Sequence, residues 1–421
     1  MEEAVRLRRV NRDQLRLEAV DLDSLVEGDH PARAIWRVLE AMELSRFYAP
    51  IKAREGVAGQ NATDPRILLA LWLYGLSEGV ASARELARLT EAHKVYRWIC
   101  GGVTVNHHLL SDFRTAHGAA VDELMSQVLA VLMHKGLVKL HRVAQDGTRV
   151  RASAGAGSFR RKRTLERCLR QARAHIAALS EQAEHPDPQR SARAFAAQQR
   201  AAREREQRVE QALCELEQLG AAKAEAKNHP QRKGELRVST TDPQARVMKM
   251  ADGGFRPAYN LQFATDSTSR IIVGVRAINA GSDSRQLEPM LEEIKRRTGA
   301  LPAQHLADGG YMNFAAVEQA AARGVEVFSP PRENRTYHID PLTPQPNDSA
   351  AIADYRRRMG SEQGKKIYKQ RASTAETVNA DLKTWRGLNR LLLRGTTKVL
   401  IVATWSALAY NLMRAIKMDW L

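Results

Sequence analysis

The chain has 421 residues, which is enough for a sizeable hydrophobic core and for more than one domain. Its 65 Lys and Arg residues outnumber its 48 Asp and Glu residues, and the formal charge of +17 favours a polyanionic partner such as nucleic acid. The three cysteines have no CxxC spacing, so they support neither a disulfide framework nor a zinc site, and we expect a reducing, cytoplasmic compartment.

Residues 1–138 contain helical patterns and no convincing strand. Asp64-Pro65 places an N-cap acceptor before a proline and predicts the start of a helix. The following ILLALWLYGL is apolar on nearly all sides, so this helix should lie at the centre of a small bundle. Ser82 and Glu85 form a capping box for a second helix, and a third follows the glycines at 101 and 102.

Arginines on the polar faces of these short helices favour a DNA-binding domain of the helix-turn-helix kind. The residues concerned are Arg84, Arg88, Arg97 and Arg114. The alternative is a helical bundle whose arginines are simply solvated. We predict an all-α N-terminal DNA-binding domain over residues 1–138.

A change of pattern follows at residues 140–152 (LHRVAQDGTRVRA), where apolar and polar residues alternate as in a half-exposed strand. Asp146 lies inside this strand. An Asp-Gly pair between two alternating runs is also a hairpin signal, so a turn at Asp146-Gly147 is the alternative.

Residues 159–235 have the pattern of a helical hairpin. Its first half has a heptad spacing of apolar residues, at Leu165, Leu169, Ala172, Ile176, Leu179 and Ala183. A His-Pro-Asp-Pro run at 185–188 interrupts this pattern. In the second half an apolar residue recurs every seven residues, at Phe195, Ala202, Val209 and Leu216, with Leu213 alongside. The hairpin starts with the cations Arg160, Arg161 and Lys162. The sequence leaves three roles open for this hairpin: contact with the DNA backbone, a solvated arm, or a contact between copies of the chain.

Strands and helices alternate after residue 239. We predict antiparallel strands at 259–265 and 271–278, a helix at 284–297, a strand at 304–307, a helix at 313–323, a strand at 325–329 and a loop at 330–350. This order, with an insertion after the first strand, describes an α/β domain of the RNase H type over residues 139–158 and 236–421. In that architecture the first strand and a later strand end lie side by side, so Asp146 and Asp308 can converge in a crevice.

Residues 368–383 (YKQRASTAETVNADLK) are helix-compatible and carry a single glutamate, Glu376. At 3.6 residues per turn, Ala372, Glu376, Asn379 and Lys383 share one helix face. A lone carboxylate among cations and a tyrosine suits a site that holds a metal ion against a polyanion, and the alternative is an ordinary solvated helix.

Other carboxylates compete for the same role. Asp242, Asp266 and Asp283 lie in the same α/β region, and Asp283 also stands between a strand and a helix. We favour Asp308 over Asp283 because Gly309-Gly310-Tyr311 follows it. Asp381 is about 140° round the helix from Glu376 and should point elsewhere.

On these motifs the sequence resembles the DDE transposases of bacterial insertion sequences. The resemblance lies in DPRILLALWLYG, YRWICGG with HHLLSDFR, VAQDGTRVRASAG around Asp146, LADGGY around Asp308, and Tyr368-x2-Arg371-x4-Glu376-x6-Lys383. The last resembles the family's Tyr-Arg-Glu-Lys signature, in which three residues, not four, most often separate Arg from Glu. The motifs around Asp146, Asp308 and Glu376 occur in the family's order and on the expected elements, which makes the resemblance specific.

The resemblance implies metal-dependent DNA cleavage and strand transfer at the ends of an insertion sequence. Asp146, Asp308 and Glu376 would hold two Mg²⁺ ions, with Mn²⁺ as a substitute. Tyr368, Arg371 and Lys383 would grip the DNA backbone. The expected partners are double-stranded DNA, as terminal inverted repeats and as target, and a second copy of the chain on that DNA. A purely hydrolytic nuclease and a DNA-binding regulator without catalysis are the alternatives.

An apolar run at residues 399–413 (VLIVATWSALAYNLM) is shorter than the roughly 20 residues that cross a membrane. It predicts a buried helix, and we expect no membrane partner.

Overall fold

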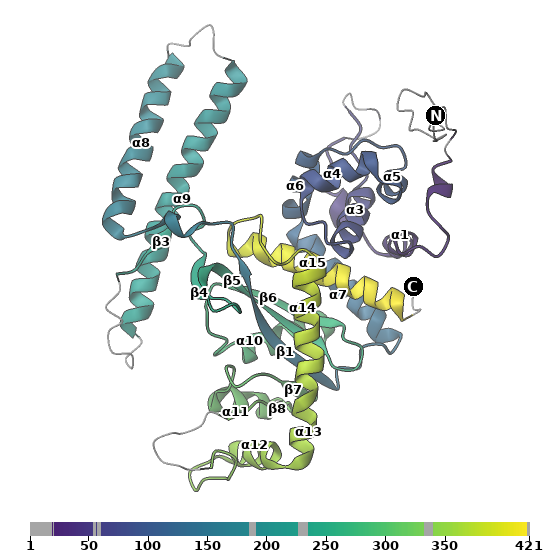
Figure 1. Ribbon diagram of the computed structural model, residues 1–421, viewed down its shortest axis with the longest axis vertical. Coiled ribbons are helices and arrows are strands. Elements are labelled where there is room, and N and C mark those ends of the chain that lie inside the picture. Colours follow the sequence, from purple (N-terminus) through teal and green to yellow (C-terminus); the bar gives the residue numbers. More distant parts are fainter. Residues whose placement is uncertain are drawn as a thin grey trace, which may run out of the picture.

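The computed structural model describes residues 19, 21–53, 56, 60–184, 191–225, 235–331 and 340–418, and places a group of helices, a sheet with further helices and a two-helix arm side by side (Figure 1). The elements before the sheet are a short 3-10 turn (Asp23–Leu25), α1 (Pro31–Ala41), α2 (Ser45–Tyr48), α3 (Pro65–Ser77), α4 (Ala83–Ala92), α5 (Lys94–Cys100), α6 (His107–Ala116) and α7 (Gly118–His134).

Helix α3 is the centre of this group. The Asp64 side chain accepts a hydrogen bond from Arg66 N (2.8 Å), which confirms the predicted helix start. All residues from Ile67 to Ser77 are buried, and α1, α5 and α15 pack around them. Helix α5 was not predicted, because its N-cap is the His93 ring, which accepts from Val95 N in place of the usual Ser, Thr, Asp or Asn.

The sheet is mixed, with strand order β4-β5-β1-β7-β8, and β6 also pairs with β5. Its strands are β1 (Arg142–Arg151), β4 (Arg246–Lys249), β5 (Phe255–Asp266), β6 (Ile272–Ile278), β7 (Gln304–Leu306) and β8 (Glu326–Phe328). Strand β5 runs antiparallel to β1, β4 and β6, whereas β1, β7 and β8 run parallel.

Strand β1 continues through Asp146 and Gly147 without a turn. It pairs with β5 from Val143 opposite Asp266 to Arg151 opposite Ala258. A tight turn at Asp146-Gly147 is therefore excluded, and the predicted strand is confirmed.

Helix α15 (Thr396–Lys417) lies between the helical group and the sheet and contacts α3, α7 and β6 (Figure 1). Asn411 in this helix accepts from Ile272 N and donates to Ile272 O, both at 2.8 Å, so its amide satisfies two backbone groups of the sheet. Of the described helices, α15 is the one long and apolar enough to cross a membrane, but 78% of its apolar stretch is buried inside the protein. It is a core helix, as predicted.

The arm consists of α8 (Lys162–Glu184) and α9 (Ala192–Glu225), which pack along each other and project away from the sheet (Figure 1). A short 3-10 turn (Ala156–Ser158) and the strands β2 (Phe159–Arg160) and β3 (Val238–Ser239), which pair with each other, connect it to the sheet. Six predicted heptad positions are buried in the arm: Leu165, Ala172, Leu179, Ala202, Val209 and Leu216. Ala212 is also buried although it was not predicted, whereas the predicted position Ala183 is exposed. The predicted helix break at 185–188 lies outside the described residues.

The remaining helices pack on and beside the sheet. They are α10 (Leu287–Thr298), α11 (Phe314–Ala322), α12 (Ala350–Gly360), α13 (Glu362–Arg371), a π-helical turn (Ala372–Glu376) and α14 (Thr377–Trp385). Helix α12 was not predicted: it begins where the expected loop at 330–350 ends, and Ser349 caps it by accepting from Ile352 N.

Candidate active site

The register of two parallel strands places Asp146 and Asp308 side by side. Ala144 in β1 pairs with Leu306 in β7, and each aspartate lies two residues beyond its partner in this pair. Neighbouring strands are about 4.8 Å apart and side chains alternate with a period of two, so both aspartates leave the same face at the same level. Strand β7 ends at Leu306 while β1 continues, which leaves Asp308 in the loop beside Asp146.

Local backbone groups orient the Asp308 carboxylate. Its Oδ1 accepts a hydrogen bond from Gly310 N (2.7 Å), and its main-chain carbonyl accepts from the Ser329 hydroxyl (2.7 Å) at the end of β8. The Gly-Gly-Tyr segment after Asp308 thus forms a tight turn around the carboxylate.

Asp146 is held from three directions. Oδ1 accepts from Gly147 N (2.9 Å) and lies 3.7 Å from Arg371 Nη1, and Oδ2 accepts from Asn379 Nδ2 (3.1 Å) in α14. The helical spacing predicted that Asn379 shares a face with Glu376, but its contact with Asp146 was not predicted.

The electrostatic setting of Asp146 favours added positive charge. Burial raises the pKa of the Asp146 carboxyl to about 6, and the neighbouring Asp308 charge acts in the same direction. The charge of Arg371 and the hydrogen bonds from Gly147 N and Asn379 oppose this rise in pKa. A cation beside Asp146 would relieve the cost of keeping it ionised.

The predicted helix over residues 368–383 is interrupted by the π-helical turn at Ala372–Glu376. Backbone hydrogen bonds in such a turn run from residue i to i+5, and the turn takes up one extra residue in an otherwise α-helical segment. Residues five apart therefore stack, and Arg371 Nη2 reaches Glu376 Oε1 at 2.8 Å. The turn gives a physical reason for the extra residue between Arg371 and Glu376. Of the four residues predicted to share one helix face, only Glu376, Asn379 and Lys383 then keep the α-helical spacing, because Ala372 lies at the start of the turn.

Arg371 links two of the three carboxylates. The Arg371 side chain is 14% exposed, and its guanidinium lies between the side chains of Asp146, which is 19% exposed, and Glu376, which is 55% exposed. Glu376 is therefore linked to Asp146 through the arginine, with more than half of its side chain exposed. Tyr368 lies within hydrogen-bonding reach of the same guanidinium.

Asp283 lies on the opposite face of β1. The residues on this face are Gln145 and Gly147 of β1 and Gln262 of β5, which is opposite Gly147. Asp283 Oδ1 accepts from Asn260 Nδ2 (2.7 Å) and Gln262 Nε2 (2.6 Å), so its charge is used within a polar network. The other carboxylates considered as alternative site residues also have hydrogen-bond partners elsewhere. Asp242 accepts from the Tyr259 hydroxyl, Asp266 from Ser269, and Asp381 from Arg386.

This polar network supports the strand that carries Asp146. Gln145 Nε2 donates to Gln262 Oε1 (3.1 Å) and to the carbonyl of Gln286 (3.1 Å), and the Tyr311 hydroxyl also bonds to Gln262 Oε1. None of these amides was predicted as a functional residue. The available signal was the alternation of two amides, Asn260 and Gln262, with apolar residues over 258–264.

His305 in β7 adds a pH-sensitive member to the network. Its Nε2 lies 2.9 Å from Gln145 Oε1, and because that oxygen only accepts, Nε2 carries the proton. The side chain is fully buried, and Nδ1 has no partner among the described residues. Burial lowers the pKa of His305 to about 4.

We expect the free energy of unfolding to fall as the pH drops from about 6.5 to about 4. In this range His305 binds a proton in the unfolded chain but stays neutral in the folded protein, so acid favours the unfolded state. The loss attributable to His305 should approach about 3 kcal/mol at the acid end. Urea unfolding of wild type and His305→Gln at several pH values measures it. A difference between the two proteins that stays constant with pH would contradict the prediction.

The donor set fits a hard divalent cation in its chemistry, although the side chains do not enclose one as they stand. Within the described ranges, no three His, Cys, Asp or Glu side chains form a metal-binding group. Asp146, Asp308 and Glu376 offer only carboxylate oxygens, which suit Mg²⁺ or Mn²⁺. Arg371 already places positive charge between two of them.

The predicted DNA-contacting cations fall into separate places. Arg84 and Arg88 are exposed on α4, where Arg88 pairs with Glu85 (2.6 Å). Arg160 lies in β2, Arg161 pairs with Glu235 (2.9 Å), and Lys162 begins α8, so the helix starts two residues later than its basic run. Lys383 is half-buried on α14.

Arg114 requires a correction. It is only 4% exposed, donates from Nη1 to the carbonyl of Ala81 (2.7 Å) and lies over the Trp72 ring, 4.4 Å from its centroid. Burial lowers the pKa of Arg114 to about 10. This arginine holds helices together and is not available to DNA.

Two family comparisons match the chain. The family described as Transposase domain (DUF772) matches residues 20–116, which include α1 to α6, and the family described as Transposase DDE domain matches residues 229–412. Asp308 and Glu376 lie inside the second stretch, whereas Asp146 and most of the arm precede it. The chain thus has the two domains of a transposase, and it belongs to the DDE transposases of insertion sequences. Comparisons with curated proteins and with solved structures gave no match.

Proposed function

We propose that this protein cleaves DNA at the ends of an insertion sequence and joins the freed ends to target DNA, using Asp146, Asp308 and Glu376 as its catalytic carboxylates. The single observation that carries this proposal is the register of β1 and β7, which brings Asp146 level with Asp308 in a family where paired aspartates are expected. The strand order, with the antiparallel strands β4, β5 and β6 beside the three parallel strands β1, β7 and β8, supports an RNase H-like fold for residues 139–158 and 236–421.

Asp146 and Asp308 would hold one side of the metal site, and Glu376 would close it from the π-helical turn. Bound there, two Mg²⁺ or Mn²⁺ ions would activate a water or a 3′-hydroxyl for attack on a phosphodiester and stabilise the leaving oxygen. Asn379 and Gly147 N keep the Asp146 carboxylate aimed at the crevice. Arg371 must release Glu376 before that carboxylate can turn inward.

The freed Arg371 guanidinium is then available to a DNA phosphate, to which a planar guanidinium binds through two hydrogen bonds. Tyr368 lies beside it, and Lys383 lies about three helical turns further along the chain, in α14, so the three predicted backbone contacts are spread along α13 and α14. We therefore expect the DNA to lie along α13 and α14, over the end of β7.

The rest of the chain would hold the DNA. We assign residues 1–138 to a helical DNA-binding domain with Arg84 and Arg88 as exposed contacts, and residues 159–235 to a hairpin insertion with Arg160, Arg161 and Lys162 at its base. Two element ends need two active sites, so we propose a homodimer on paired ends.

A plasmid carrying the DNA that flanks the coding sequence tests the proposal. We expect purified protein with Mg²⁺ to release the flanked segment and to insert it into a second plasmid, because the three carboxylates suffice for cleavage and for joining. Gel analysis and sequencing of the junctions measure both steps. Cleavage without joining would show a nuclease, and binding without cleavage would show a regulator; either result would overturn the proposal.

A further inference from the structure

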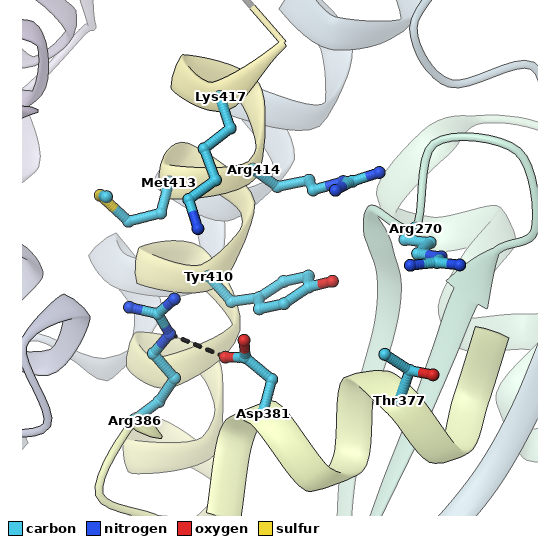
Figure 2. Close-up of a pocket in the computed structure, with 8 residues that line it drawn as sticks. All are labelled: Arg270, Thr377, Asp381, Arg386, Tyr410, Met413, Arg414 and Lys417. Carbon is cyan, nitrogen blue, oxygen red and sulfur yellow. Dashed lines mark hydrogen bonds and ion pairs between the residues drawn. The ribbon is translucent and has the colours of Figure 1, made fainter. Parts of the chain in front are cut away.

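A basic pocket lies on the far side of α14 from Asp146. Asn379 points to Asp146, whereas Thr377, two residues or about 200° away, and Asp381 face this pocket. Its volume is about 110 Å³, comparable to three or four waters at about 30 Å³ each, which suits a phosphate group. Its lining consists of Arg270, Thr377, Asp381, Arg386, Tyr410, Met413, Arg414 and Lys417 (Figure 2).

The pocket carries more positive charge than its own carboxylate can balance. Asp381 pairs with Arg386 (2.8 Å), whose Nη1 also bonds to the Ser77 carbonyl, so this pair is internally satisfied. Arg414 uses Nε to bond the Ser269 carbonyl (3.0 Å), which fixes the arginine and leaves the end of its guanidinium open. In the described part of the chain, Arg270 and Lys417 have no acidic partner.

Hydroxyl groups complete the lining. In Figure 2 the Tyr410 ring lies at the centre of the pocket, with its hydroxyl directed to the side where Arg270 and Arg414 lie. Burial raises the pKa of Tyr410 to about 12, so the hydroxyl keeps its proton and can donate it to an anion. Thr377 offers a second hydroxyl from α14.

Arg270 is held in a backbone conformation that arginine seldom adopts. It lies in the turn between β5 and β6 with φ of 60°, a region usually taken by Gly or Asn. Such strained conformations persist where the surrounding structure enforces them, and they cluster at functional sites. Here the strained position delivers an unpaired guanidinium to the pocket.

We infer that this pocket binds a backbone phosphate of the DNA, with Arg270, Arg414 and Lys417 as its charged contacts. The inference rests on the proposed function, since it takes DNA as the polyanion. The phosphate contact would hold the DNA on α14 from the face opposite the catalytic carboxylates. It would therefore position the duplex without touching the reacting bond.

The test is Arg270→Asn, because asparagine tolerates the positive φ while the substitution removes the guanidinium and its charge. We expect binding of a short mixed-sequence duplex to weaken roughly tenfold at low salt, and the slope of log K against log salt to become shallower by about 0.9, the value for one phosphate. The unfolding temperature should stay the same or rise, because the strain is relieved. A purely structural role for Arg270 would lower stability and leave the salt slope unchanged.

Lys295→Gln on α10 is the matched control, since Lys295 is exposed and outside the pocket, and its slope should equal that of wild type. If Arg270→Asn folds poorly, Lys417→Gln provides the same test from an exposed position. An unchanged slope in the pocket variants overturns the inference alone, whereas wild type that binds no duplex overturns the proposed function. A third outcome is that Arg270→Asn leaves duplex binding unchanged but abolishes a stabilisation of the protein by inorganic phosphate. That result would assign the pocket to a free anion and overturn the DNA contact.

Discussion

Replacing Asp146 with asparagine is expected to lower the rate of DNA cleavage by about 10³-fold or more while DNA binding is retained. Asparagine has the same shape, but it carries no negative charge and one fewer acceptor oxygen. Asp146 is the carboxylate that contacts Arg371 and Asn379 and interacts with Asp308, so its charge is central to the site. Cleavage of end-containing DNA under single-turnover conditions measures the effect.

Asp283→Asn is the control for that experiment. Asp283 lies on the other face of β1, and asparagine at this position can still accept the hydrogen bonds from Asn260 and Gln262. We expect cleavage to fall less than about tenfold, the effect of a small shift in a supporting network. Loss of cleavage in Asp283→Asn together with activity in Asp146→Asn would reverse the assignment of the second carboxylate.

The strands around the site could be predicted from the sequence because they are regular. Alternation of side chains placed Asp146 inside a strand, and the short predicted strand at 304–307 placed Asp308 at a strand end. The pairing of β1 with β7 joins residues about 160 apart in the chain, so its register depends on packing of the whole sheet. Only the structure shows that both aspartates are two residues past the same pair.

The π-helical turn could not be predicted from helical periodicity. Residues 368–383 contain no Gly or Pro, so their local preferences indicate an uninterrupted α-helix. The one trace in the sequence is the additional residue between Arg371 and Glu376. The turn takes up this residue and lets both side chains meet over Asp146.

Charge alone was also insufficient to identify DNA contacts. Arg114 and Arg84 have the same side chain and lie on neighbouring helices, yet Arg114 is buried over Trp72 and Arg84 is exposed. The helical spacing of Arg114 did not reveal the tryptophan beneath it, because Trp72 is on another helix. Conversely, Arg270 and Arg414 gave no sequence signal, since only the fold brings the β5–β6 turn to α15.

The second large effect is expected from Gly147→Ala. A Cβ on Gly147 would lie less than 3 Å from Gln262 Nε2, Asp283 Oδ1 and Asn260 Oδ1, all in the network behind Asp146. Asn260 and Gln262 are buried, Asp283 is partly buried, and all three are hydrogen-bonded to one another, so making room for the methyl group breaks bonds and shifts β1. A displacement of about 1 Å at a catalytic group lowers rates by about 10²-fold, and we expect cleavage to fall by at least that factor.

Gly155→Ala separates this effect from the general cost of replacing a glycine. Gly155 lies just beyond β1, has φ of −92°, and a Cβ there would meet nothing within 4 Å. We expect normal cleavage from this variant and a normal unfolding temperature. The same cleavage assay and a thermal melt compare the two proteins. Equal cleavage by both variants would show that the polar network does not position Asp146, and the site would then depend on Asn379 and Arg371 alone.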